Sequence, residues 1–230
     1  MQLDNFPKVL WINLNHSIKR REYMEKLLNE HNLENTRIEA VNGFNPIELN
    51  AKCIPNKNYT SGENACTVSH MMAMQYFVNN IDDDSIVIFE DDVSFDFLSL
   101  IPFNWSNLIT KLPIDCDVVQ LAVTHETSIT PDLVRNLPTL KYYGSVAYLI
   151  NKSAANQILK QYLDATTNLI DLSNKIHVTA DSIITNTVTT YSIPIFTYKT
   201  SDSIIHPNHL YIHQRAKSEQ LHMWKNFNYV

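Results

Sequence analysis

The chain has 230 residues and a mass of 26.5 kDa, the size of one domain, so we predict a single domain over residues 1–230. Hydrophobic residues make up 44% of the chain and charged residues 18%, a balance that excludes disordered and fibrous proteins. Because the formal net charge is −6 and no basic run occurs, we expect no nucleic-acid partner.

The first fifty residues predict a β-α-β opening. Residues 9–14 form an apolar run of strand length, and apolar residues take helical spacing after Ser17, which can cap that helix. Residues 37–41 alternate between polar and apolar as a second strand does, and Asn42-Gly43 is a turn pair.

The middle of the chain predicts a surface loop, a long helix and a buried strand. Residues 44–60 contain prolines, asparagines and lysines, as loops do, and a helix capped by Ser61 is expected to run to Asn79. Residues 85–89 are continuously apolar, as in a parallel strand that is buried on both faces.

The rest of the chain continues the alternation of strands and helices. Strands are predicted at residues 118–123, 146–150 and 193–198, and helices at residues 153–162 and 180–189. Alternation along the whole chain is typical of the α/β class, so we expect a Rossmann-like fold in which helices flank a central, mostly parallel sheet.

Cysteine and glycine usage narrows the possibilities further. Cys53, Cys66 and Cys116 are odd in number and lack CxxC spacing, which favours a reducing compartment and indicates neither a disulfide framework nor a structural zinc site. With three glycines, the chain has no Walker loop and no GxGxxG fingerprint. No apolar run reaches the length of a membrane span, so we expect no transmembrane segment and a cytoplasmic location. The oligomeric state is not indicated.

The most informative motif is Glu90-Asp91-Asp92, directly after the predicted strand at residues 85–89. Ligands of open α/β sheets bind at the carboxyl ends of strands, and three neighbouring carboxylates repel one another unless a cation lies among them. Magnesium or manganese fits such a site and is completed by phosphate oxygens. The acids at residues 82–84 are better explained as a solvated turn.

Histidines gather near the C-terminus, at positions 206, 209, 213 and 222. An imidazole can complete the coordination of a metal such as manganese, which makes His206 and His209 candidate ligands. For any one of these histidines, the spacing alone fits an exposed or packed side chain better than a metal ligand.

Two further groups of residues allow more than one interpretation. Residues 61–70 open a helix whose free amides attract anions, and Ser69 or His70 could face a ligand there, although capping and core packing explain the same pattern. Cys66 fits a small buried residue better than a nucleophile. Asp181 fits a first-turn carboxylate or a general base.

Several segments together resemble the family 25 glycosyltransferases, which include lipopolysaccharide and collagen-type galactosyltransferases. The order and spacing of the matching segments, over residues 8–205, are more specific than any one motif. The matching segments are Val9–Asn15 followed by Arg20-Arg21, Ile38–Gly43, Gly62-Glu63 with Cys66, Ser69 and His70, the metal motif Phe89–Val93, which is of the DXD type, and Ala180-Asp181. The chain departs from the family pattern at Asn15 and Asn42, where acids are usual, and at Ala65, where glycine is usual.

The resemblance implies a GT-A fold and a role for each matching residue. Asp92 would hold Mn²⁺ or Mg²⁺, assisted by Asp91 or Glu90, and Asp181 would deprotonate the acceptor. The uridine pocket would be lined by Asn13, Leu14, Arg20 and Val41, with Glu90 near the ribose, and Ser69 and His70 would border the sugar. His206 and His209 would add a metal ligand, and residues 207–230 would fold over the donor as a lid.

The function implied by this resemblance is metal-dependent, inverting transfer of a hexose, with galactose as the first candidate, from a UDP-sugar to a hydroxyl acceptor. The acceptor would be a glycan or hydroxylysine of a collagen-like protein, in the host cytoplasm or a viral factory if the source is viral. Two alternatives stay open: a metal-dependent phosphohydrolase, and a non-catalytic module that keeps the fold and only binds a partner.

Overall fold

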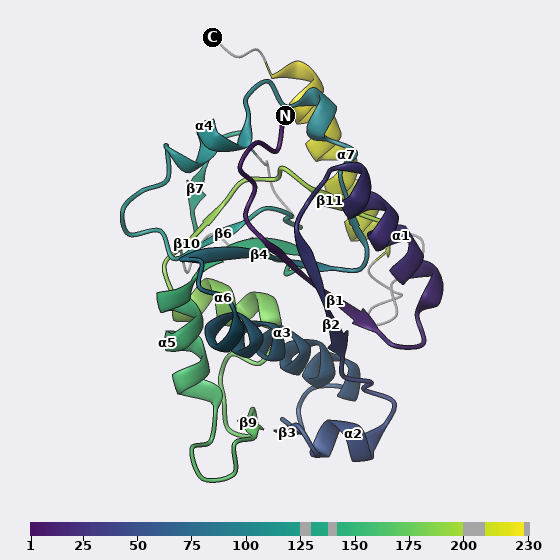
Figure 1. Ribbon diagram of the computed structural model, residues 1–230, viewed down its shortest axis with the longest axis vertical. Coiled ribbons are helices and arrows are strands. Elements are labelled where there is room, and N and C mark those ends of the chain that lie inside the picture. Colours follow the sequence, from purple (N-terminus) through teal and green to yellow (C-terminus); the bar gives the residue numbers. More distant parts are fainter. Residues whose placement is uncertain (125–129, 138–141, 200–209, 228–230) are drawn as a thin grey trace.

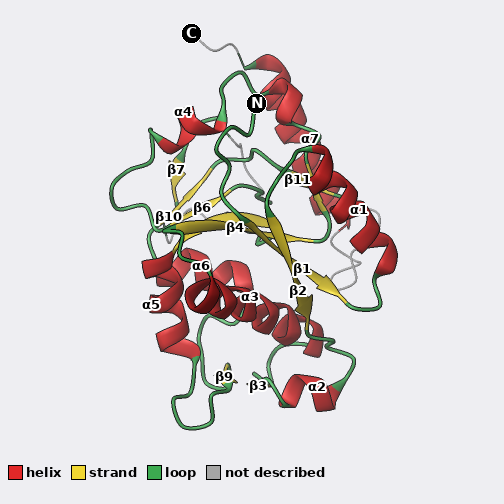
Figure 2. Ribbon diagram, in the orientation of Figure 1, coloured by secondary structure: helices red, strands yellow, loops and turns green. Residues whose placement is uncertain are grey.

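The computed structural model describes residues 1–124, 130–137, 142–199 and 210–227, and its framework is a seven-stranded sheet between two layers of helices (Figures 1 and 2). The strands of this sheet lie in the order β2-β1-β4-β8-β6-β10-β7. Their bounds are Asn35–Ala40 (β2), Val9–Leu14 (β1), Ser85–Glu90 (β4), Ala147–Asn151 (β8), Val118–Gln120 (β6), Thr190–Ser192 (β10) and Val134–Arg135 (β7).

The sheet is mixed, although most of its strands share one direction. β2, β1, β4, β6 and β10 run one way, because β1 pairs in parallel with β2 and β4 and β10 pairs in parallel with β6. β8 is antiparallel to both β4 and β6, and β7 is antiparallel to β10. This arrangement confirms the predicted α/β class with a central, mostly parallel sheet.

Helices cover both faces of the sheet (Figure 2). On one face lie α3 (Ser61–Asn80), α5 (Lys152–Tyr162) and α6 (Ala180–Thr187); on the other lie α1 (Ile18–Glu30), α4 (Trp105–Ile109) and α7 (Leu210–Asn226). The shorter elements are α2 (Pro46–Asn50), β3 (Cys53–Ile54), β5 (Val93–Ser94), a 3₁₀ turn at Leu98–Leu100, β9 (Ile170–Asp171) and β11 (Thr197–Tyr198).

β4 shows why the central strands read as continuously apolar. Ile86 and Ile88 belong to the hydrophobic cluster beneath α3, whereas Val87 and Phe89 belong to the cluster on the opposite face. Because successive side chains of a strand point to opposite faces, both sets must be apolar when both faces are buried.

Several elements differ from the prediction. The strand predicted at residues 193–198 is only partly confirmed: residues 197–198 form the short β11, whereas the sheet strand β10 ends at Ser192 and residues 193–196 belong to neither strand. Pro194 lies in this segment, and proline cannot donate a ladder hydrogen bond. The loop predicted at residues 44–60 contains α2, whose N-cap Asn45 accepts a hydrogen bond from the Glu48 backbone. Among the described helices, none is long and apolar enough to cross a membrane.

Candidate active site

The site begins where β1 and β4 end side by side. The parallel register pairs Ile12 of β1 with Glu90 of β4, so residues 13 and 14 lie beside the acids that follow β4. Helix α3 approaches the same edge of the sheet, and Gly43 permits this: a Cβ atom there would lie 2.6 Å from the Ser61 carbonyl oxygen. The carboxyl ends of β1 and β4 and the start of α3 therefore lie close together.

A pocket of about 660 Å³ opens at this edge of the sheet and collects the predicted site residues. Ten of the twelve predicted residues line it: Asn13, Leu14, Arg20, Val41, Ser69, His70, Glu90, Asp91, Asp92 and Asp181. The other two, His206 and His209, lie outside the described residues. The pocket thus brings together residues that are separated by up to 168 positions, from Asn13 to Asp181.

Arg20 neutralises the two aspartates. Its Nη1 lies 3.0 Å from Asp91 Oδ1, and its Nη2 lies 2.9 Å from Asp92 Oδ2. The second oxygen of Asp91 accepts a 2.6 Å hydrogen bond from Asn13 Nδ2, so both oxygens of Asp91 have partners. The Asp91 carboxylate is therefore fixed in place by partners within the protein.

Asp92 differs from Asp91 because one of its oxygens has no partner in the described part of the chain. Its Oδ1 is buried and accepts no hydrogen bond from the residues that the structure describes. Burial, together with the negative charge of Glu90, raises the pKa of Asp92 to about 7, although Arg20 opposes the shift. Burial also raises the pKa of Asp91. A buried carboxylate oxygen without a partner has the chemistry of a cation ligand, so Asp92 fits the predicted metal.

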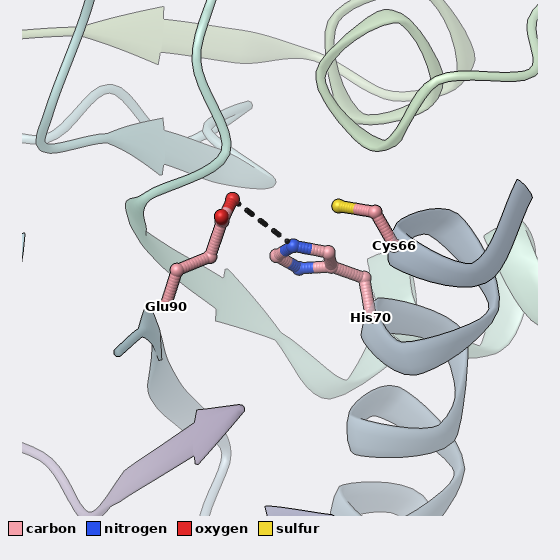
Figure 3. A group of neighbouring side chains, drawn as sticks. All are labelled: Cys66, His70 and Glu90. Carbon is pink, nitrogen blue, oxygen red and sulfur yellow. Dashed lines mark hydrogen bonds and ion pairs between the residues drawn. The ribbon is translucent and has the colours of Figure 1, made fainter. Parts of the chain in front are cut away.

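Glu90 makes different contacts from its two neighbours (Figure 3). Its Oε1 accepts a 2.7 Å hydrogen bond from Ser145 Oγ and lies 3.3 Å from His70 Nε2. Burial alone would raise the pKa of Glu90, but the contacts with His70 and Ser145 hold it below its usual value. The imidazole is fixed from its other side, since His70 Nδ1 lies 3.0 Å from the Tyr148 hydroxyl.

The N-terminal half of α3 carries the next group of site residues. The helix begins with a capping box, in which the Thr60 side chain accepts from the Glu63 backbone while the Glu63 carboxylate accepts from the Thr60 backbone. Ser69 donates a 2.7 Å hydrogen bond to the Ala65 carbonyl and accepts one of 2.9 Å from the Val41 backbone. Ser69 thus fixes the Val41 backbone at the pocket wall.

Asp181 lies in the first turn of α6, where the helix dipole favours a carboxylate. It accepts hydrogen bonds from the backbone amides of Ser182 (2.8 Å) and Gly144 (3.4 Å). Gly144 has φ +121°, a conformation that other residues rarely adopt, and it lines the same pocket. The position of Asp181 therefore fits both interpretations of this residue.

Sequence analysis missed several residues that shape the site. Arg37 donates hydrogen bonds to the side chain and the carbonyl oxygen of Asn13, at 3.0 and 3.3 Å, and so orients the amide that binds Asp91. The signal available was a charged residue inside a predicted strand. Ser145 and Tyr148 reach the site only because β8 pairs antiparallel with β4, which local sequence does not reveal.

The C-terminal segment of the chain also reaches the pocket. Ile212 and His213, near the start of α7, line it, and the His213 ring packs edge-on against Tyr198 with 5.1 Å between centroids. Further along the helix, Trp224 is buried and donates a 2.7 Å hydrogen bond to the Pro194 carbonyl. One end of α7 is thus anchored in the core while its other end borders the pocket; a closing motion of residues 207–230 stays a prediction.

A known protein family matches the N-terminal part of the chain. Residues 6–108 match the family model of glycosyltransferase family 25 (LPS biosynthesis protein). The predicted resemblance to family 25 is confirmed. The matched segment includes every predicted pocket residue except Asp181, and it supports glycosyltransferase activity, which entails a sugar donor and an acceptor.

Two solved structures are similar to this chain. A197 from STIV is 13% identical, with 84% of each chain covered and a TM-score of 0.43. A glycosyltransferase involved in the glycosylation of the major capsid of PBCV-1 is 8% identical, with 93% of this chain and 98% of that chain covered and a TM-score of 0.41. Neither likeness bears on what this chain binds.

Proposed function

We propose that the protein is a metal-dependent, inverting glycosyltransferase that moves a hexose from a UDP-sugar to a hydroxyl group of a glycan or of hydroxylysine, with galactose as the first candidate. The observation that carries the proposal is the buried Oδ1 of Asp92, which has no partner among the described residues, in a pocket that also holds Arg20 and Asp181. This oxygen atom could bind a cation, and it lies beside residues that could bind a sugar donor.

The proposed roles follow from the contacts of each residue. Asp92 would hold Mn²⁺ or Mg²⁺, and when bound the cation supplies positive charge to the diphosphate of the donor. Asn13 and Asp91 are fixed by their mutual hydrogen bond and keep Arg20 at the same edge of the sheet. Asn13, Leu14, Arg20 and Val41 would line the nucleotide end of the pocket.

Asp181 is the proposed general base. In inverting transfer, the acceptor oxygen forms a bond to the anomeric carbon while the bond from that carbon to UDP breaks, and a carboxylate takes the proton of the acceptor hydroxyl. Asp181 lines the pocket without contacting Arg20, which leaves its carboxylate able to accept that proton. Phe44 and Tyr143 are 80% and 45% exposed and also line the pocket, so they offer an apolar surface to an acceptor.

UDP release from a panel of UDP-sugars, with manganese and with a chelator, tests this proposal. We expect release from one sugar, and a reduction of about 100-fold or more in Asp92→Asn. The matched control is Asp83→Asn, which changes an exposed carboxylate in a loop and should retain full activity. Asp181→Asn should lose transfer while still binding UDP.

The opposite results are equally informative. Absence of release from every sugar, together with absence of UDP binding by calorimetry, would overturn the proposal in favour of a non-catalytic module. Metal-dependent turnover of phosphate esters without any sugar requirement would favour a phosphohydrolase. Equal activity in Asp92→Asn and Asp83→Asn would remove Asp92 from the proposed role.

A further inference from the structure

A second set of possible metal ligands lies in the pocket, formed by Cys66, His70 and Glu90 (Figure 3). One ligand atom of each, a sulfur, an imidazole nitrogen and a carboxylate oxygen, lies within 4.8 Å of the other two. This cluster is separate from the contacts of Arg20, which pairs with Asp91 and Asp92.

Secondary structure places these three side chains together. Cys66 and His70 are one helical turn apart on α3, and residues with this spacing project from the same face of a helix. Glu90 is the last residue of β4, and Figure 3 shows the two helical side chains directed toward it. The cluster therefore joins α3 to the carboxyl end of the sheet.

We propose that Cys66, His70 and Glu90 bind Zn²⁺. Thiolate and imidazole are ligands that select zinc, whereas magnesium and manganese prefer oxygen. The cluster is therefore chemically distinct from the Asp92 carboxylate that the proposed function uses. A pocket with both kinds of ligand can discriminate between soft and hard cations.

The dimensions of the cluster suit a tetrahedral zinc ion. Zinc bonds of about 2.0–2.3 Å place neighbouring ligand atoms roughly 3.3–3.7 Å apart. His70 Nε2 and Glu90 Oε1 already lie 3.3 Å apart, and one ligand atom of each of the three residues lies within 4.8 Å of the other two.

The neighbours of the His70 ring orient Nε2 toward the proposed zinc site. The Tyr148 hydroxyl lies 3.0 Å from His70 Nδ1 and is fully buried, so it fixes the ring with Nε2 directed at Glu90. A tyrosine hydroxyl can accept as well as donate, so its oxygen can accept a hydrogen bond from the Nδ1–H group when Nε2 binds a metal. Ser145 orients Glu90 through Oε1, while Oε2 accepts no hydrogen bond within the described residues.

The fourth ligand position would open into the pocket, because all three residues line it. Zinc sites with three protein ligands keep this position for water or for a group of a bound ligand. We therefore expect one exchangeable water, or an anionic oxygen, on the ion.

Cobalt titration of the metal-free protein tests this inference, because cobalt takes zinc ligands and reports a bound thiolate by a charge-transfer band in the near ultraviolet. We expect a thiolate band that saturates at one cobalt ion per chain and that is lost when zinc displaces this ion. Cys66→Ser should abolish the band, and Cys66→Ser and His70→Gln should each weaken zinc binding by at least about 100-fold. Cys116→Ser and Asp92→Asn are the controls, and each should retain the thiolate band and the wild-type affinity for zinc.

The outcomes separate this inference from the proposed function, since no donor sugar is present in the titration. Cobalt binding without a thiolate band, or a band that is lost in Cys116→Ser and kept in Cys66→Ser, would overturn the zinc site. Circular dichroism of Cys66→Ser distinguishes the loss of a ligand from the loss of the fold, and the wild-type band decides the matter if that variant does not fold. A band in a protein without transferase activity would leave the zinc site standing.

Discussion

Asp91 and Asp92 are adjacent in sequence but have different electrostatic surroundings. Asp91 has a partner on each oxygen, one from Arg20 and one from Asn13. Asp92 shares Arg20 and keeps one buried oxygen without a partner among the described residues. The consequence is that Asp92 is the carboxylate in this motif whose charge is least compensated.

This difference predicts how stability depends on pH. The pKa of Asp92 is raised to about 7 in the folded protein, whereas an unfolded aspartate has a pKa of about 3.9. Between these values the folded state holds a proton that the unfolded state has lost, so the free energy of unfolding should fall as pH rises from about 4 to about 7. Asp92→Asn should reduce this fall, as measured by urea unfolding in the presence of a chelator. The pKa of Asp91 is also raised, so part of the fall in the free energy of unfolding should remain in Asp92→Asn. Identical slopes in the two proteins would contradict the prediction.

At the residue level, sequence analysis could locate the site but not assign every contact. The strand-end position of Glu90, Asp91 and Asp92 follows from local pattern, and all three line the pocket as predicted. The hydrogen bonds of Ser69 with Ala65 and Val41 depend on how α3 packs against the end of β2, which a single sequence does not state. The proximity of Cys66 to Glu90 depends on the same packing, so cysteine spacing alone indicated no zinc site.

Among the elements, α7 shows the limit of hydrophobic patterning. Ala216, Gln220 and Trp224 are the most buried residues over positions 211–226 of this helix, at 0%, 0% and 2% exposure. Their spacing of four is helical, but the stripe contains a glutamine, whose Nε2 donates a 2.6 Å hydrogen bond to the Val123 carbonyl. A polar residue in the buried stripe conceals the helix from a search for apolar periodicity.

The packing of α7 predicts a large effect of Trp224. Trp224→Ala should lower the free energy of unfolding by about 3–5 kcal/mol, because it removes a large side chain from the core. Trp224→Phe should cost less, since it keeps most of the apolar contact and loses the hydrogen bond to Pro194, a contribution of about 1 kcal/mol. Both values are measured by urea unfolding.

Tyr211 provides the control on the same helix, because it is 74% exposed. Tyr211→Ala should change stability by no more than about 0.5 kcal/mol. Should Trp224→Ala behave like Tyr211→Ala, α7 would be detached from the core in solution.

At the scale of the whole molecule, the α/β class was predictable and the strand order was not. Class follows from the alternation of strands and helices, which local pattern reveals. Order and direction depend on contacts distant in sequence: β8 lies between β4 and β6 and runs against both, although its residues are as apolar as those of a parallel strand. That reversal brings Ser145 to Glu90.

Ligand binding should stabilise the whole fold, because the pocket joins β1, β4, α3 and α6. A ligand that binds the folded state alone adds about 2.7 kcal/mol at 100 times its dissociation constant. For a domain of this size, that raises the melting temperature by roughly 5–10 °C. We expect this shift with UDP and manganese together and a smaller one with either alone, as measured by differential scanning calorimetry. Asp92→Asn should lose the additional shift from manganese; an undiminished shift would argue that the cation binds elsewhere.

The contacts of Arg20 with Asp91 and Asp92 affect how the protein folds before any metal ion or substrate is bound. Because a side chain of the chain itself already balances Asp91 and half of Asp92, the newly made polypeptide can complete its fold in surroundings poor in metal ions. Under the proposed metal dependence, scarcity of metal would leave a folded but inactive protein that regains activity when the ion returns, without degradation and new synthesis.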